Sequence, residues 1–219
     1  MAGKLSKLSI ILFFLSACLY LVLLPFIHYP LNTIIKPIPI ILLIIIAWQT
    51  TADQTTKTFL IIALILSLLG DIVLTLPGEL AFKLGILSFL LAHSAYISLF
   101  LKDAQFRLNR TLYFLPILLF ILGSYWFMSP HLEQMLIPVT IYLCFLAIMV
   151  FTAFQVQQHP VLIIGGACSF LFSDFIFALT QFVLGESHYT NILIMFSYYL
   201  AQLLLVLGLI QRQTGLKPA

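Results

Sequence analysis

Long apolar stretches alternate with short polar segments along almost the whole chain. A transmembrane α-helix needs about 20 consecutive, mostly apolar residues, and stretches of about this length occur eight times here. The predicted spans are Leu8–Ile27, Ile34–Gln49, Thr58–Leu76, Phe82–Leu101, Thr111–Met128, Gln134–Phe154, Val161–Leu184 and Tyr189–Ile210. Because spanning segments satisfy their backbone groups internally, the pattern predicts an all-α membrane protein. We expect one domain over residues 1–219, a bundle of eight transmembrane helices.

Composition points to the same class of protein. The chain is 63% hydrophobic and 8% charged, with a mean hydropathy of +1.16, whereas a soluble domain is about 45–50% apolar and 25% charged. The solvent of this protein is therefore lipid. The net charge of +3 comes from basic residues that are scattered among short loops, so nucleic acid is not expected as a partner. The sequence leaves the oligomeric state open.

Lysine and arginine residues indicate an orientation, because they favour the cytoplasmic loops of membrane proteins. With the N-terminus inside, only Lys36 and Lys83 fall on the outer side. The inner side holds Lys4, Lys7, Lys57, Lys102, Arg107, Arg110, Arg212 and Lys217. This bias predicts that the N- and C-termini are both cytoplasmic. At about 1.5 Å per residue, Asp71 then lies about 8 Å, and Asp174 about 15 Å, from the outer ends of their spans.

Two carboxylates interrupt the apolar stretches, Asp71 within Leu60–Leu76 and Asp174 within Val161–Leu184. A charge near the middle of a bilayer costs roughly 3 kcal/mol on insertion scales. No lysine or arginine lies at the centre of a predicted span, so we expect neither carboxylate to be neutralised. We therefore interpret the two aspartates as a functional site. They converge on one cavity in the outer half of the membrane if the bundle brings their spans together.

Further polar residues recur at helical spacing on the spans that carry or flank the aspartates. Each of them must find a partner or water at membrane depth, which predicts a polar pocket inside the bundle. Taken singly, the serines and the glutamine are more typical of hydrogen bonds between helices, and a lone histidine is more typical of a hydrogen-bonded core. The residues are Ser67, His93, Tyr96, Ser173, Tyr198, Tyr199 and Gln202.

Two carboxylates in one low-dielectric cavity cannot both ionise cheaply, so one stays protonated beside a charged partner. Such a pair suits hydrolysis of acetals, glycosides and enol ethers, in which one group donates a proton and the other stabilises an oxocarbenium-like state. A proton relay in a transporter or lipid flippase would use the same groups. A third alternative is a metal-dependent lipid amidase of the ceramidase-like kind. The scattered histidines argue against it, and no metal site is predicted.

Five segments follow one another in a recognisable order between Lys36 and Leu209. They are Lys36-Pro37, Leu66–Leu74, Phe82–Tyr96, Gly166–Asp174 and Ser197–Gln202. In order and spacing they resemble the YhhN-like lysoplasmalogenase family, whose members are eight-span membrane proteins. Ser197 stands where threonine is expected, and it keeps the hydroxyl group.

The resemblance implies hydrolysis of the vinyl-ether bond of lysoplasmalogen, a lysophospholipid. The products would be a fatty aldehyde and glycerophosphoethanolamine or glycerophosphocholine, and no cofactor would be needed. The expected location is a bacterial inner membrane, with the lysophospholipid substrate and membrane lipid as the expected partners.

We assign the chemistry to Asp71 and Asp174, with the deeper Asp174 as the acid. Lys36 is expected either to pair with the lipid phosphate or to anchor the helix at the interface. The remaining substrate-binding residues are expected to orient water or the lipid backbone. They are Ser67, His93, Tyr96, Ser173, Tyr198, Tyr199 and Gln202.

Overall fold

The computed structural model describes residues 2–214 of the 219-residue chain, and the side chains of residues 7–211. In this part of the chain every regular element is a helix, and an isolated bridge joins Ala104 to Val156. The orientation argument used three residues that are not fully described. The side chains of Lys4 and Arg212, and all of Lys217, lie outside the described part.

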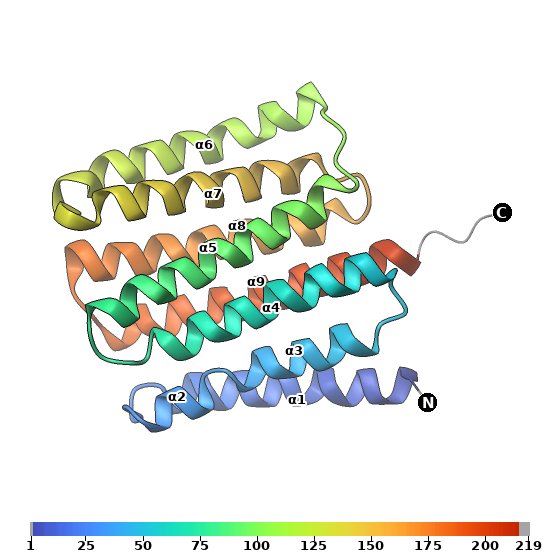
Figure 1. Ribbon diagram of the computed structural model, residues 1–219, viewed down its shortest axis with the longest axis horizontal. Coiled ribbons are helices and arrows are strands. Elements are labelled where there is room, and N and C mark those ends of the chain that lie inside the picture. Colours follow the sequence, from blue (N-terminus) through green and yellow to red (C-terminus); the bar gives the residue numbers. More distant parts are fainter. Residues whose placement is uncertain (1, 215–219) are drawn as a thin grey trace.

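The described residues form nine α-helices that run along one common axis (Figure 1). Short 3₁₀ turns at Ser129–His131 and Glu133–Met135 connect α6 to α7, and a π-helical turn at Thr180–Leu184 continues α8. The helices are α1 (Ala2–Leu23), α2 (Leu31–Ile35), α3 (Ile38–Gln49), α4 (Gln54–Val73), α5 (Glu79–Leu101), α6 (Leu108–Met128), α7 (Leu136–Gln155), α8 (Pro160–Leu179) and α9 (His188–Thr214).

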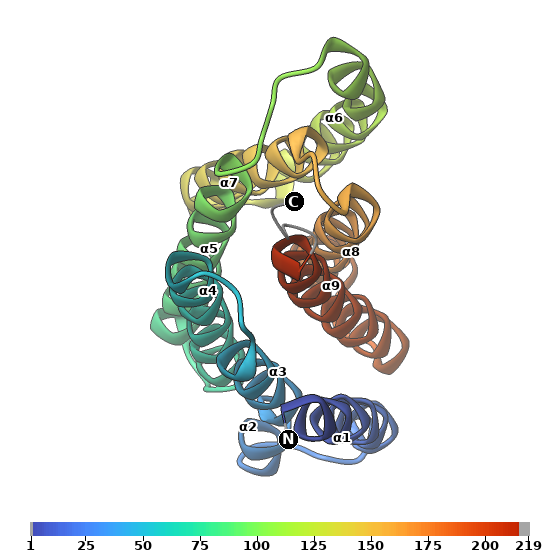
Figure 2. The ribbon, with the colours of Figure 1, turned by 90° about the vertical axis from the view of Figure 1, so that its right-hand side faces the viewer.

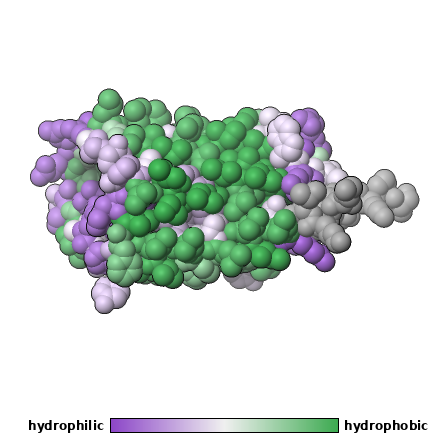
Figure 3. All heavy atoms as spheres, turned by 90° about the horizontal axis from the view of Figure 1, so that it is seen from below, coloured by the Kyte–Doolittle hydropathy of each residue, from purple (hydrophilic) through white to green (hydrophobic). Residues whose placement is uncertain are grey.

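Seven helical segments of the described chain are long and apolar enough to cross a membrane, and they match the second to eighth predicted spans. The described apolar part of α1, Lys7–Leu23, is shorter. Apolar side chains cover the middle of the face drawn in Figure 3, and hydrophilic ones gather at both ends. The start of α1 and the end of α9 lie toward the same end of the bundle (Figure 1). The eight-span count and the cytoplasmic termini stay predictions.

Local sequence determines where α4 begins. The carboxylate of Asp53 accepts a hydrogen bond of 3.0 Å from the backbone N–H of Thr56, which caps the helix and starts it at Gln54. The predicted span began later, at Thr58, because it was drawn from the apolar stretch alone and so left out the polar first turn of the helix. The helix ends at Val73, two residues after the aspartate that it carries.

The helices form an arc with a central pair inside it (Figure 2). Helices α1, α3, α4, α5, α7 and α6 follow one another around the arc, and α8 and α9 pack together along its inner side. Glycines permit the closest approaches. A Cβ atom at Gly70 of α4 would lie 2.7 Å from the ring of Phe89 on α5, and one at Gly166 of α8 would lie 2.8 Å from Leu205 on α9. The central position of α9 lets it contact both aspartate-bearing helices.

Candidate active site

One cavity of about 110 Å³ lies inside the bundle, and both aspartates line it. This volume is several times the roughly 10–15 Å³ that a single water needs. Asp71 reaches the cavity from α4 and Asp174 from α8, more than a hundred residues later in the chain. The lining also includes Lys36, Ser173 and Tyr198, and otherwise it is mostly apolar. We call this space the central cavity.

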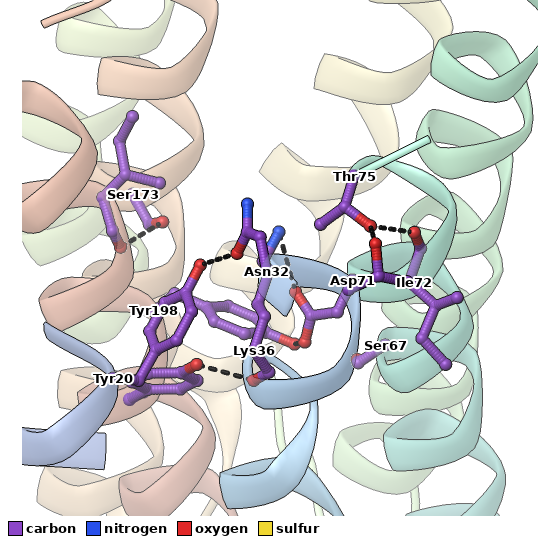
Figure 4. A network of polar contacts seen from close by, with 12 residues as sticks. Tyr20, Asn32, Lys36, Ser67, Asp71, Ile72, Thr75, Ser173 and Tyr198 are labelled. Carbon is purple, nitrogen blue, oxygen red and sulfur yellow. Dashed lines mark hydrogen bonds and ion pairs between the residues drawn. The ribbon is translucent and has the colours of Figure 1, made fainter. Parts of the chain in front are cut away.

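Asp71 is an ionic partner in a nearly dry environment. The residue is 1% exposed. The ammonium Nζ of Lys36 lies 3.4 Å from its Oδ1, and the Tyr198 hydroxyl donates a hydrogen bond of 2.7 Å to its Oδ2 (Figure 4). The expectation that neither carboxylate is neutralised is therefore wrong for Asp71. Lys36 was expected to pair with the lipid phosphate or to anchor the helix, and not to pair with Asp71, because it lies at the start of a span in the sequence. Its side chain is only 12% exposed.

The backbone around Lys36 is held by hydrogen bonds from other helices. The Tyr199 hydroxyl of α9 donates to the Lys36 carbonyl oxygen at 2.7 Å. The hydroxyls of Thr33 and Thr75 share a hydrogen bond of 2.7 Å, which joins α2 to the segment after α4. These contacts fix the break between α2 and α3 beside Asp71, so the ammonium group is preorganised toward the carboxylate.

Asp174 has a different set of partners. The Tyr142 hydroxyl of α7 donates a hydrogen bond of 2.5 Å to its Oδ2. Among the described side chains, no lysine or arginine lies within ion-pair distance of it. Its side chain is 17% exposed and lines the central cavity. The two carboxylates thus share one space but not one electrostatic environment.

His93 of α5 lies next to Asp174 without a hydrogen bond to it. The side chain is fully buried, and its Nε2 is 3.8 Å from Asp174 Oδ2, too far for a hydrogen bond. Within the described residues neither ring nitrogen has a hydrogen-bond partner, which is rare for buried polar groups. The ring packs between Tyr142 and Phe170, with centroids 5.1 and 4.8 Å away. This is not the hydrogen-bonded core histidine that a lone residue would suggest.

Three of the predicted substrate-binding residues form hydrogen bonds with one another. The Tyr96 hydroxyl donates to Gln202 Oε1 at 2.6 Å, and Gln202 Nε2 donates to the Ser67 hydroxyl at 2.9 Å. Ser67 in turn donates to the Ala63 carbonyl oxygen. All are buried and lie outside the lining of the central cavity. Their hydrogen bonds join α5, α9 and α4, and their contact with substrate stays a prediction.

Two other predicted residues, Ser173 and Tyr198, do line the cavity. The Ser173 hydroxyl donates to the carbonyl oxygen of Ile194 at 3.0 Å and so ties α8 to α9. The Tyr198 ring stands edge-to-face against Phe89 and Phe170, with centroids 5.8 and 5.6 Å away. This aromatic packing holds the hydroxyl of Tyr198 toward Asp71.

Sequence reasoning missed Tyr142, the hydrogen-bond donor to Asp174. A signal was present, since a tyrosine in the middle of an apolar span needs a partner for its hydroxyl. Which partner it finds depends on how α7 packs against α8. As for metal binding, no cluster of three or more His, Cys, Asp or Glu residues in the described chain is placed to hold an ion.

Comparison with known families matches residues 31–209 to the YhhN family. The chain belongs to this family. Lys36, Asp71, Asp174 and Tyr198 all lie inside the matched region, so the central cavity is built from the YhhN part of the chain. All of α1 lies before it.

Curated relatives of this chain include proteins named lysoplasmalogenase. One, from Mycobacterium bovis, is 31% identical over 158 residues, which cover 69% of this chain and 60% of that protein. The match to the mouse lysoplasmalogenase TMEM86B is 33% identical over 214 residues, covering 94% of this chain and 87% of the mouse protein. The chain therefore spans about 60% of the length of the mycobacterial relative that it matches. No solved structure matches it significantly.

Proposed function

We propose that this YhhN protein is a lysoplasmalogenase. It hydrolyses the vinyl-ether bond of a lysoplasmalogen to a fatty aldehyde and glycerophosphoethanolamine or glycerophosphocholine. Relatives with that name support the reaction class. The observation that carries the proposal is the asymmetry of the two carboxylates in one cavity: Asp71 pairs with Lys36, whereas Asp174 has a tyrosine hydroxyl as its hydrogen-bond partner.

This asymmetry assigns the roles. A buried carboxylate is stable in its charged form when it is paired with a cation and hydrogen-bonded, as Asp71 is. An unpaired charge in an apolar cavity is costly, so Asp174 holds a proton instead. A protonated acid and an ionised carboxylate facing one space are what enol-ether hydrolysis requires. The proposal therefore gives the proton to Asp174, the same aspartate that was assigned as the acid from its depth.

The reaction begins when Asp174 transfers its proton to the β-carbon of the vinyl ether. The electron pair of the double bond forms the new C–H bond and leaves an oxocarbenium ion at the adjacent carbon. The charge of Asp71 stabilises this cation. Water then adds to the cationic carbon and gives its proton to Asp71, which forms a hemiacetal.

The hemiacetal collapses by breaking its C–O bond to glycerol. The glycerol oxygen takes the proton from Asp71, and the hemiacetal hydroxyl returns its proton to Asp174 as the aldehyde forms. One water is consumed, and both carboxyl groups regain their starting states. Lys36 also lines the cavity, so its ammonium group can pair with the phosphate of a bound lipid while it stays paired with Asp71. His93 lies beside Asp174 but outside the lining of the central cavity, so a role in orienting the substrate or the water stays a prediction.

The direct test is aldehyde release from lysoplasmalogen by the purified protein in nanodiscs, detected by mass spectrometry. We expect Asp71→Asn and Asp174→Asn each to reduce the rate by at least a hundredfold, because general acid–base catalysis contributes about 10²–10⁴-fold. Glu79→Gln is the matched control, since Glu79 is an exposed carboxylate whose ion pair is with Lys83. It should retain the wild-type rate.

Two results would contradict the proposal. Full activity in either asparagine variant removes that residue from the chemistry. A wild-type protein that releases no aldehyde, but drives pH-dependent flux in liposomes, favours the proton-coupled transporter instead.

A further inference from the structure

A second hollow lies between α6 and α8 on the outer surface of the bundle. Among its lining residues, Phe120 and Phe127 are 42% and 52% exposed, and both belong to a face that is apolar enough to contact lipid. Serine supplies the one polar side chain of the lining. We call this hollow the α6–α8 groove; its lining residues are Phe120, Gly123, Ser124, Phe127, Phe175 and Leu179.

The α6–α8 groove adjoins the central cavity. Phe120, Ser124 and Phe175 line both spaces. The rings of Phe120 and Phe175 meet edge-to-face with centroids 4.9 Å apart, so these two side chains stand where cavity and groove adjoin. Asp174 and Phe175 both line the central cavity, so the groove adjoins the same cavity as the carboxyl group that we propose as the acid.

Helix α6 is the least embedded of the seven long apolar helices. Only 17% of its span is buried, against 28–61% for the other six. It packs mainly on α7 at the end of the arc of helices (Figure 2). Helix α6, which forms one wall of the groove, is therefore packed against α7 on one side and faces the bilayer on the other.

We infer that the α6–α8 groove binds the hydrocarbon tail of the lipid substrate and leads it from the bilayer to the central cavity. This inference rests on the proposed function. In a vinyl-ether lipid the reacting bond joins the alkyl chain to the glycerol. When this bond lies beside Asp174, the head group and the tail therefore extend from it in opposite directions. Lys36 and Asp71 supply the charged end of the cavity. The apolar groove beside Asp174 supplies the exit for the tail.

Gly123 is the residue that keeps the groove open. A Cβ atom at this position would meet nothing within 4 Å, so a larger side chain there occupies the groove without disturbing the fold. Leucine also favours a helix more than glycine does. Gly123→Leu is thus a change that fills the groove and leaves the aspartates untouched.

The test measures binding without hydrolysis. Lysophosphocholines with a saturated ether and tails of 8 or 16 carbons are titrated against the protein in nanodiscs. The tail lies in lipid before it binds, and lipid is as apolar as the groove, so the effect of Gly123→Leu is steric: overpacking an apolar site weakens binding by a factor of about 5–150. We expect Gly123→Leu to weaken binding of the 16-carbon lipid by a factor in this range and to leave binding of the 8-carbon lipid unaffected. Leu179→Trp, which narrows the groove from α8, is expected to act in the same way.

Leu122→Trp is the matched control, because Leu122 is a neighbouring residue of α6 that is 55% exposed and does not line the groove. It should bind both lipids as the wild type does. The inference would be overturned if the affinity for lysolipids depended on tail length equally in the wild type, Gly123→Leu and Leu179→Trp. This holds even if all three proteins release aldehyde from lysoplasmalogen. A wild type that releases no aldehyde, but loses long-tail binding on Gly123→Leu, would leave the tail site standing and refute the proposed reaction.

Discussion

The ion pair between Lys36 and Asp71 makes a quantitative prediction about stability. Its two charges are 3.4 Å apart, so their attraction is about 5 kcal/mol at an effective dielectric constant of about 20. Much of this is offset by the desolvation of both groups. Removing only the cation forfeits the attraction but leaves Asp71 buried at 1% exposure. We therefore expect Lys36→Met to lower the free energy of unfolding by about 3–5 kcal/mol, the usual cost of breaking a buried pair.

The double variant Lys36→Met/Asp71→Asn separates the ion pair from simple packing. It removes the uncompensated charge, so it should regain most of the stability that Lys36→Met loses. Unfolding in mixed micelles, followed by circular dichroism, measures all three proteins. The control is Lys83→Met, which breaks the exposed pair with Glu79 and should change stability little.

Two outcomes would refute this reasoning. One is a Lys36→Met protein within about 1 kcal/mol of the wild type, which would mean that the pair contributes no more than an exposed one. The other is a double variant no more stable than Lys36→Met, which would assign the loss to the shape of the lysine side chain rather than to the orphaned charge.

Three further predictions concern single contacts. Tyr142→Phe removes the donor to Asp174, whose hydrogen bond becomes charge-assisted as the carboxyl group gives up its proton. At about 1.5–3 kcal/mol for a hydrogen bond to a charged group, the variant should slow aldehyde release about tenfold or more, with unchanged circular dichroism. Gly70→Ala places a methyl group 2.7 Å from the Phe89 ring and should destabilise the protein by about 1–3 kcal/mol in the micelle assay. Asp53→Ala removes the cap of α4 and should cost about 0.5–2 kcal/mol at neutral pH. Burial raises the pKa of Asp53, but hydrogen bonds and the charge of Lys102 together outweigh burial, so the pKa lies below its ordinary value. Asp53 therefore stabilises the folded protein at any pH above its ordinary pKa. The cost of Asp53→Ala disappears as the pH falls through the lowered pKa of the folded state.

Much of the fold was predictable because lipid imposes strict rules on a chain. Seven helices follow the predicted spans with shifts of a few residues at their ends, as between Thr58 and the observed start of α4 at Gln54. The shift at Gln54 occurs because the polar first turn capped by Asp53 extends the helix beyond its apolar stretch. Capping depends on side-chain hydrogen bonds, which apolar pattern does not register.

The candidate site was predictable in part. Asp71 and Asp174 stood out because a carboxylate in an apolar span is costly wherever the helix lies. Lys36 and Tyr142, their partners in the structure, did not stand out as partners. Tyr96 was expected to contact substrate, and in the structure it bonds to another side chain of the bundle.

The sequence by itself determined that the chain is helical, that it belongs in a membrane, and that two aspartates lie where charge is expensive. Tertiary structure alone decided that Asp71 meets a cation and that Asp174 meets a tyrosine hydroxyl. The physical reason is that lipid is as apolar as the protein interior, so membrane helices carry little pattern to mark which face turns inward. The rotation of each helix about its own axis, which selects the partners of a buried charge, is settled only when the helices pack.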